Sequence, residues 1–424
     1  MTKENLEQTR ERVLGGTYRT FYSSPLVVDS ASGCTITDVE GTEYLDAYNN
    51  VPVIGHSSPE IAEAVNRQLL RANTHTRYLD RPVIDYADQL VAVFPDRLES
   101  VVFACSGSEA NDLALRVAAH AAGRDGVIVT RHAYHGTTRS VAEISPSLVG
   151  LDEIGEHVEA IDVPGWDEPD FDAQFAAAIR QGGIRLERRG HPCGAVVLDS
   201  ALTSDGIVQP RSLVATVEAI HKLGAMYIAD EVQSGFGRTG SAWGFERLHV
   251  VPDLVTLGKP MANGMPMSAV IGPRDIFAAF GESQRYFNTF AGTAASAAAA
   301  GVVLSALESG ALTERARSGG ARLTAQLAEI IGESEVPARV RHNGLMLGVD
   351  FLDRSESNSA RRRASFIVEE LYRERVLVST TGPCANVVKI RPPLTISDEE
   401  LDSIARGFGV ALQRLEISER SHDG

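Results

Sequence analysis

The stretch AMYIADEVQSGFGRTG (225–240) decides the fold, because a short apolar run ends in an acidic residue and a glycine-rich turn follows. Four more short runs rich in valine, isoleucine and leucine occur along the chain: VVFA (101–104), GVIVT (126–130), AVVLD (195–199) and LVTLG (254–258). Strands that are apolar throughout belong to a sheet covered on both faces, usually a largely parallel one. We therefore predict an α/β domain over roughly 50–305.

The pattern changes after about residue 310. Long helical stretches are expected at 312–331, 359–374 and 397–414, and short strands separate them. This arrangement is typical of an α+β layer, which predicts a second, smaller domain in the C-terminal part of the chain.

The composition is that of an ordinary globular protein, with 43% hydrophobic and 23% charged residues. Acidic residues outnumber basic ones by 56 to 40, so the net charge is −16, and nucleic acid and anionic membranes are not expected partners. No apolar run approaches the roughly 20 residues that span a bilayer. The stretch MTKENLEQTRERVLGG (1–16) has no apolar segment, and the four cysteines lack metal or disulfide spacing. We expect a cytoplasmic protein without a metal.

Ligands of such sheets collect at the carboxyl ends of the strands, so the residues that follow each run are candidate site residues. CSGSEAN (105–111) follows the first run and places Ser106, Gly107 and Ser108 at the start of a helix. Exposed N–H groups and hydroxyls at a helix start can bind a phosphate, although a plain serine cap is the alternative. RHAYHG (131–136) follows the second run and supplies an aromatic ring, and its histidines lack a third metal ligand.

Asp230 and Lys259 each follow an apolar strand, where a charge is costly unless a partner meets it. They are one strand–helix–strand step apart and are expected at the same sheet edge. One interpretation is a buried salt bridge. The other is a cofactor whose ring nitrogen faces Asp230 and whose aldehyde condenses with Lys259. Pyridoxal phosphate (PLP) needs a lysine, a carboxylate, a phosphate site and a stacking ring, and the sequence offers all four.

The motifs SGSEAND, AYHG, DEVQSGFGRTG and LGKPMANG resemble the signatures of class III PLP enzymes of fold type I, the family of ω-amino acid aminotransferases. The resemblance extends from 45–61 to 389–401. It implies a large domain with a mostly parallel seven-stranded sheet between helices, a small α+β domain, and a homodimer with shared active sites. We predict an N-terminal segment 1–50 that packs with the small domain, a large PLP-binding domain 51–308 and a small domain 309–424.

The resemblance also implies the catalytic pair. Lys259 would bind the cofactor covalently, and Asp230 would pair with its pyridinium nitrogen. The other implied cofactor contacts are Ser106, Gly107 and Ser108 at the phosphate, Tyr134 and His135 at the ring, Gln233 near the ring hydroxyl, and Thr289, which would reach the phosphate bound by the other subunit.

Several strings are closer to a branch of this family that does not transfer amines. Aminotransferases that bind an α-carboxylate usually have an arginine three residues before Pro-Pro-Leu, where this chain has Lys389, with Arg391 two residues further on. NNVPVIGH (49–56), NTHTRYLD (73–80) and YFNTF (286–290) resemble the ethanolamine-phosphate and 5-phosphohydroxylysine phospho-lyases. The branch implies elimination of phosphate from a small phosphorylated amine such as O-phosphoethanolamine.

A phospho-lyase must also bind the substrate phosphate, and cationic or hydrogen-bonding side chains suit it. The candidates are Arg77, ranked first, and Tyr18, Asn50 and Lys389; for each, a surface or structural role is the alternative. Arg391 is expected to pair with an acid of the small domain.

The sequence departs from the family at three places. Asp199-Ser200 stands where the aminotransferases usually have Glu-Pro and the lyase branch Glu-Ser. Asn263-Gly264-Met265-Pro266 stands where the lyase branch commonly has Asn-Gly-His-Pro, and Gly292-Thr293-Ala294 stands where Gly-Asn-Pro is expected. Two other functions stay open: a class III amine or ω-amino acid aminotransferase that uses a keto acid such as pyruvate, and a non-catalytic relative. The intact Lys259 and Asp230 argue against the second.

Overall fold

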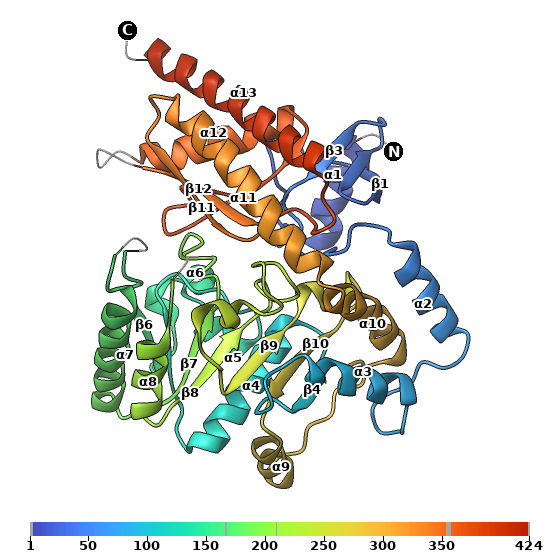
Figure 1. Cartoon of the computed structure of the whole chain (residues 1–424), viewed down its shortest axis with the longest axis vertical. Coiled ribbons are helices and arrows are strands. Elements are labelled where there is room, and N and C mark those ends of the chain that lie inside the picture. The colour runs from blue at the N-terminus through green and yellow to red at the C-terminus, as the bar shows by residue number, and fades with distance from the viewer. Residues whose placement is uncertain (1–2, 166–167, 209, 353–357, 423–424) are drawn as a thin grey trace.

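The computed structural model describes residues 3–165, 168–208, 210–352 and 358–422. A seven-stranded sheet forms the centre of the larger, lower body in Figure 1. Its strands, in spatial order, are β4 (Ser100–Ala104), β10 (Ser268–Gly272), β9 (Leu254–Leu257), β8 (Met226–Asp230), β7 (Cys193–Asp199), β5 (Gly126–Thr130) and β6 (Val158–Ile161). All neighbours pair in parallel except β10, which runs antiparallel to both β4 and β9. The predicted fold class is confirmed.

Side chains of the strands alternate between two apolar layers, which explains why the strands are apolar throughout. In β5, Val127 and Val129 belong to the cluster that contains α4, whereas Ile128 belongs to the larger cluster that contains α7. Successive side chains point to opposite faces of the sheet, and neither face meets water. No position in the strand therefore favours a polar residue. The run GVIVT (126–130) is buried at every residue.

Helices cover both faces of this sheet, and α7 and α8 pack side by side on one of them (Figure 1). The helices of this part of the chain are α2 (Pro59–Leu69), α3 (Arg81–Ala92), α4 (Gly107–Ala122), α5 (Arg139–Glu143), α6 (Pro146–Val149), η1 (Leu151–Glu153), α7 (Phe171–Arg188), α8 (Val214–Lys222), η2 (Gly244–Leu248), η3 (Lys259–Ala262), α9 (Arg274–Ser283) and α10 (Ala294–Glu308). Helix α4 ends at Ala122, because Gly123 adopts a left-handed conformation (φ 63°).

The smaller body contains both ends of the chain. A four-stranded sheet of β11 (Ala338–Asn343), β12 (Met346–Phe351), β15 (Val387–Ile390) and β14 (Ser379–Thr381) is accompanied by α11 (Ala311–Gly332), α12 (Ser359–Arg373) and α13 (Asp398–His422). The N-terminal part forms α1 (Lys3–Leu14), β1 (Val28–Ser32), β2 (Thr35–Asp38) and β3 (Glu43–Asp46). Strand β3 pairs in parallel with β13 (Val376–Leu377), so the two chain ends share a sheet (Figure 1).

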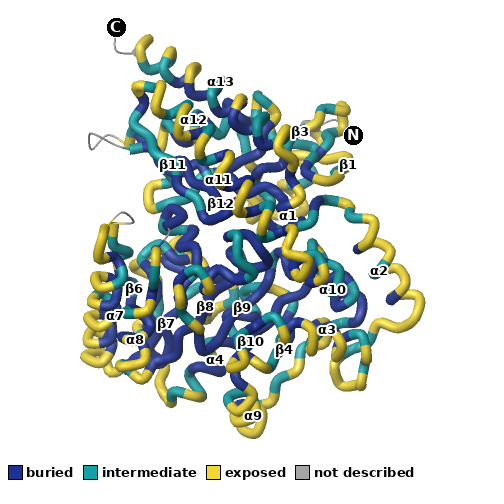
Figure 2. The backbone as a smooth tube through the Cα atoms, in the orientation of Figure 1, coloured by how far each residue is buried: buried dark blue, intermediate teal, exposed yellow. Residues whose placement is uncertain are grey.

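Buried residues form a continuous band through β7, β8 and β9 and across into the small domain at β12 (Figure 2). Among the described residues, no single helix is long and apolar enough to cross a membrane. Only α10 and α11 together pass such a test, and they are bent by 62° at their junction.

Candidate active site

Lys259 stands at the end of β9, where the chain turns into η3. Three segments meet there, because a Cβ on Gly258 would lie 3.2 Å from Val232 and 3.3 Å from the Cα of Gly107. Burial lowers the pKa of Lys259, and the positive charge of Arg391 lowers it further. A lysine with a lowered pKa is more often neutral and can attack an aldehyde.

Asp230 ends the neighbouring strand β8 and is held by three donors. Its Oδ2 accepts a hydrogen bond from Asn111 Nδ2 (3.0 Å) and contacts His135 Nδ1 (2.7 Å), and its Oδ1 accepts one from the Val232 amide (3.0 Å). Asn111 is itself fixed, because its Oδ1 accepts a hydrogen bond from Thr256 Oγ1 at 2.6 Å. The carboxylate therefore has one orientation, which suits a group that must stay charged beside a ring nitrogen.

The start of α4 forms a cradle with the loop after β5. Ser106 caps the helix through its Oγ, which accepts a hydrogen bond from the amide of Glu109 at 3.3 Å. Its contact with a cofactor phosphate stays a prediction. A Cβ on Gly107 would lie 2.8 Å from Val232, and one on Gly136 would lie 2.4 Å from Ser108 Oγ. Only glycine fits at these two positions, and the free N–H groups of a 16-residue helix remain available to an anion.

These residues line one pocket at the carboxyl ends of the strands. The lining consists of Gly107, Ser108, Tyr134, His135, Gly136, Asp199, Asp230, Val232, Gln233 and Lys259. It includes a lysine of lowered pKa, a fixed carboxylate and a glycine-edged anion cradle. The residues present therefore fit PLP.

Gln233 connects this pocket with the small domain. Its side-chain Oε1 accepts a hydrogen bond from Arg391, and its backbone carbonyl accepts one from Asn50 Nδ2 at 2.8 Å. Arg391 also donates to the carbonyl of Tyr48 at 2.8 Å. The expectation that Arg391 pairs with an acid of the small domain is wrong, because its partners are an amide side chain and a backbone carbonyl. The contact of Gln233 with a ring hydroxyl stays a prediction.

Lys389 and Arg391 interact electrostatically with Lys259, and we call the three side chains the cation cluster. Lys389 Nζ is 5.9 Å from the centre of the Tyr48 ring, and the Arg391 guanidinium carbon is 4.9 Å from it. Burial lowers the pKa of Lys389 well below its ordinary value, and the charges of Arg391 and Lys259 lower it further. The cluster makes this side of the pocket attractive to an anion.

The other three predicted phosphate ligands are exposed or have structural hydrogen bonds. Arg77 is exposed, and its guanidinium carbon is 3.8 Å from the centre of the Phe287 ring. Tyr18 is 66% exposed. Asn50 is buried; its Oδ1 accepts a hydrogen bond from Arg238 Nε (2.9 Å), and its Nδ2 donates one to the Gln233 carbonyl. These contacts give Asn50 a structural role within one chain.

Thr289 is likewise exposed, two residues after Phe287. Within a single chain, two of the four phosphate candidates are thus near the pocket: Lys389, whose charge interacts with Lys259, and Asn50, which contacts the lining residue Gln233. The roles of Arg77, Tyr18 and Thr289 stay predictions.

Asp199 lies beside Asp230, since the two residues are register partners of β7 and β8. Its oxygens accept hydrogen bonds from the amides of Ala201 (3.0 Å) and Thr203 (2.9 Å). Burial raises the pKa of Asp199, and the charge of Asp230 raises it further. The Asp199 side chain, which is shorter than the glutamate of related enzymes, is thus held by hydrogen bonds from the turn that follows it.

Sequence reasoning missed the contacts that fix Asp230. His135 was expected at the cofactor, but not as the partner of Asp230, and Asn111 was not singled out. A signal for Asn111 did exist: it is a polar residue beside Ala110, Leu113, Ala114 and Val117 on the buried face of α4. A polar group at such a position needs a buried partner.

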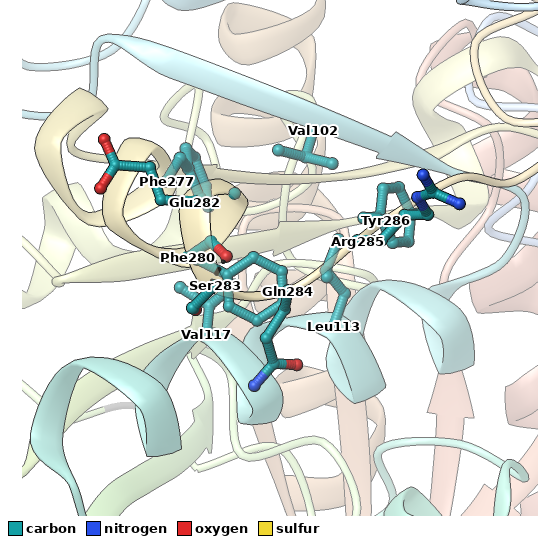
Figure 3. A pocket seen from close by; sticks show the side chains of 11 residues that line it. Val102, Leu113, Val117, Phe277, Phe280, Glu282, Ser283, Gln284, Arg285 and Tyr286 are labelled. Atoms are coloured by element: carbon teal, nitrogen blue, oxygen red, sulfur yellow. Dashed lines mark hydrogen bonds between the residues drawn. The ribbon is translucent and has the colours of Figure 1, made fainter.

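A second pocket lies between β4, α4 and α9 (Figure 3). Val102, Leu113, Val117, Phe277 and Phe280 form apolar walls, and the segment 281–286 completes it. The residues that line it include no lysine or histidine, so it is not a candidate for the chemistry of the first pocket.

The fold and this site define a PLP-dependent enzyme. Residues 18–412 match the family model for aminotransferase class-III, and the chain belongs to this family, whose members use pyridoxal phosphate.

The proteins that are similar to this chain include some named as aminotransferases and others named as phospho-lyases. The chain is 34% identical to an "alanine–glyoxylate aminotransferase 2-like" protein of Drosophila melanogaster, over 96% of this chain and 87% of that protein. It is 30% identical to "ethanolamine-phosphate phospho-lyase homolog 1" of Caenorhabditis elegans, over 94% and 91%. A phospholyase from Arthrobacter, solved in complex with phosphoethanolamine, is 38% identical with a TM-score of 0.92, over 96% of this chain and 99% of that one.

Proposed function

We propose that this enzyme is a phospho-lyase that eliminates phosphate from a small phosphorylated amine, O-phosphoethanolamine or a close analogue. The observation that carries the proposal is the cation cluster of Lys259, Lys389 and Arg391. In the described part of the chain, Arg391 makes no ion pair with a carboxylate, so its charge is available to an anion that enters beside Lys259. The similarity to a phospholyase solved with phosphoethanolamine supports the same substrate class.

The residues can carry out the elimination as follows. Bound in the pocket, PLP withdraws electrons from the carbon next to the substrate amine and makes its proton acidic. Lys259 Nζ, whose pKa is lowered by burial and by the charge of Arg391, would take that proton. Asp230 would face the ring nitrogen, in the orientation set by Asn111 and His135.

Lys389 and Arg391 would bind the phosphate and offset the charge that grows on its bridging oxygen as the carbon–oxygen bond breaks. Phosphate leaves, and the remaining enamine takes up water to give an aldehyde and ammonia. For O-phosphoethanolamine, one molecule of water is consumed and acetaldehyde, ammonia and phosphate are formed.

An aminotransferase is the second candidate, and the similarity to the Drosophila protein favours it. Lys389 and Arg391 can also hold a carboxylate, and a keto acid such as pyruvate would then accept the amine. The two candidates differ in whether a keto acid is needed for turnover.

We further propose a homodimer whose active sites use residues of both subunits. Arg77 and Thr289 are exposed, and large apolar side chains near them are exposed as well: Leu79 (95%), Phe290 (72%) and Tyr78 (65%). Apolar side chains gathered on one surface are typical of an interface. A partner subunit would cover them, and Arg77 and Thr289 would then reach its pocket.

The test is phosphate release from O-phosphoethanolamine by the PLP-loaded enzyme without a keto acid. We expect phosphate and acetaldehyde in equal amounts, and none from Lys259→Ala. If no phosphate appears but the amine is transferred to pyruvate, the enzyme is an aminotransferase.

The role of Arg77 has a test of its own. Arg77→Ala should raise KM for the phosphorylated amine by roughly tenfold or more, because a charge-assisted hydrogen bond is lost. Arg81→Ala, an exposed arginine that pairs with Asp85, is the matched control. Equal KM values for the two variants would remove Arg77 from the site.

A further inference from the structure

Residues 286–290 follow α9 as a segment with two different sides. Tyr286 and Asn288 are half-buried, whereas Phe287 and Thr289 are exposed. Exposure alternates along the segment as it does in an extended chain, which places Phe287 and Thr289 outward. Thr289 is predicted to reach the cofactor phosphate of the other subunit, but Phe287 has no part in the chemistry above.

The inward side chains hold this segment against β4 and the start of α4. The hydroxyl of Tyr286 donates a hydrogen bond to the carbonyl of Phe103 at 2.8 Å. Asn288 Nδ2 donates one to Glu109 Oε2 at 2.8 Å, and Glu109 belongs to the first turn of α4. The backbone at Phe287 is therefore fixed on both sides, and its ring is presented from a defined place.

The Phe287 ring contacts the guanidinium of Arg77. The guanidinium carbon lies 3.8 Å from the ring centre, within the range in which a cation is attracted by an aromatic face. His75 meets the same ring edge to face, with 5.6 Å between the ring centres, and its Nδ1 accepts a hydrogen bond from the Arg77 amide at 3.3 Å. Asn73 fixes the start of this loop, because its Oδ1 accepts a hydrogen bond from the Ala295 amide at 3.0 Å.

The guanidinium of Arg77 keeps its hydrogen-bond donors open. Among the described residues it forms no ion pair with a carboxylate, whereas Arg81, four residues later, pairs with Asp85 at 3.3 Å. A contact with an aromatic face uses none of the N–H groups, so the guanidinium fork remains available to two oxygens of a phosphate. Phe287 thus restrains Arg77 without neutralising it.

We propose that Phe287 is a positioning residue that holds the Arg77 guanidinium in place for the substrate phosphate in the pocket of the partner subunit. It touches neither substrate nor cofactor and acts through Arg77. An arginine restrained in advance loses less side-chain freedom when its ligand arrives, so the phosphate binds more tightly. The segment then serves both phosphates, the cofactor's through Thr289 and the substrate's through Phe287. This inference rests on the proposed function, from which it takes the phosphorylated substrate and the shared sites.

The test is the Kd of inorganic phosphate for the PLP-loaded enzyme, which needs no turnover. PLP fills the cofactor's own phosphate site, so added phosphate reports on the substrate site. Phe287→Leu keeps an apolar side chain but removes the aromatic face, and we expect the Kd to rise roughly three- to tenfold. Phe287→Tyr keeps the face and should bind phosphate as wild type does. An unchanged Kd in Phe287→Leu, or a Phe287→Tyr that is equally weak, would overturn the proposal.

A double variant tests whether Phe287 acts through Arg77. Arg77→Ala removes the guanidinium and should itself raise the Kd for phosphate. The addition of Phe287→Leu to Arg77→Ala should then raise it no further, because the two residues serve one interaction. Additive effects of the two substitutions would contradict the positioning role.

The Kd of the apo-protein for PLP separates positioning from a general disturbance of the segment. Phe287→Leu should leave this Kd unchanged, because Tyr286 and Asn288 still hold Thr289 in place. A parallel loss of PLP affinity would show that the whole segment had moved, and it would overturn the specific role of Phe287.

The proposed function fails in a different measurement. Phosphate release from O-phosphoethanolamine distinguishes a lyase from an aminotransferase, whereas the Kd for inorganic phosphate does not depend on that reaction. A wild-type enzyme that releases no phosphate, yet binds it with the expected dependence on Phe287 and Arg77, would refute the lyase and support the positioning role. An Arg77→Ala variant that binds phosphate as tightly as wild type would overturn that role, whatever the activity.

Discussion

Arg391, the residue after β15, donates a hydrogen bond to Gln233 Oε1, and this contact joins the small domain to the segment that follows Asp230. Arg391 also lowers the pKa of Lys259 through its charge. The small domain therefore takes part in setting the reactivity of a lysine that belongs to the large domain.

Arg391→Gln should make Lys259 a poorer nucleophile. Removal of the positive charge raises the pKa of Lys259, and each unit reduces its neutral fraction about tenfold at a pH below that pKa. We expect the apo-protein to take up PLP roughly three- to tenfold more slowly at pH 7, with the difference vanishing at high pH. The measurement is the rate of PLP absorbance change against pH. Arg391→Lys keeps the charge and should behave as wild type; a slow Arg391→Lys would assign the effect to geometry.

Asn111→Ala should weaken both the fold and the cofactor site. The substitution leaves the Thr256 hydroxyl and the His135 carbonyl without their partner and removes one donor to Asp230. With about 1–3 kcal/mol for each buried group, we expect a loss of roughly 2–4 kcal/mol in unfolding free energy. Denaturant unfolding of the apo-protein and the Kd for PLP are the measurements.

Asn263→Ala is the contrasting control for that variant. The Asn263 side chain accepts a hydrogen bond from the Ile54 amide (3.0 Å) and donates one to the Gly55 carbonyl (2.9 Å). Neither contact involves Asp230. It should lose stability while the PLP affinity stays unchanged. A similar loss of PLP affinity in both variants would show that general destabilisation, rather than the Asp230 contact, is responsible.

Gly107→Ala should close the phosphate cradle, and Val232→Ala should reopen it. The new Cβ would lie 2.8 Å from one Val232 methyl carbon and 3.0 Å from the other. Such overpacking costs about 1–3 kcal/mol, and we expect the Kd for PLP to rise by roughly ten- to a hundredfold. The double variant should recover most of the affinity. A double variant as weak as Gly107→Ala would place the clash elsewhere.

Much of this site follows from the order of residues along the chain. The five predicted runs became strands β4, β5, β7, β8 and β9, because runs buried on both faces have no polar positions. Since parallel strands end at one sheet edge, Asp230 and Lys259 could be placed together in advance.

The remaining contacts depend on how distant segments of the chain pack together, which no local sequence pattern encodes. Strand β10 inserts antiparallel between β4 and β9, although it follows β9 directly in sequence. His135 meets Asp230 only because the loop after β5 turns back over the sheet edge. Arg391 meets Gln233, 158 residues earlier, because the small domain docks there. Each of these arrangements depends on contacts between segments that are far apart in the sequence.

Glu231 should give the protein a pH-dependent stability that Glu231→Gln lacks. Glu231 is fully buried and accepts hydrogen bonds from Ser200 and Ser234 hydroxyls (2.5 and 2.9 Å) and from the amides of Gly244 and Phe245 (2.8 and 2.9 Å). Burial nevertheless raises its pKa to about 7.

The folded protein therefore binds a proton at Glu231 more tightly than the unfolded chain does. This contribution to the unfolding free energy is fully present below the unfolded pKa of about 4.3, and it is lost as the pH rises toward 7. Glu231→Gln cannot ionise, so its unfolding free energy should fall less steeply from pH 5 to 7, by up to about 1.4 kcal/mol per pH unit. We expect the variant to be less stable at pH 5, because its amide N–H groups face donors. Denaturant unfolding of the apo-protein at pH 5, 6 and 7 measures this, and parallel slopes for the two proteins would contradict it.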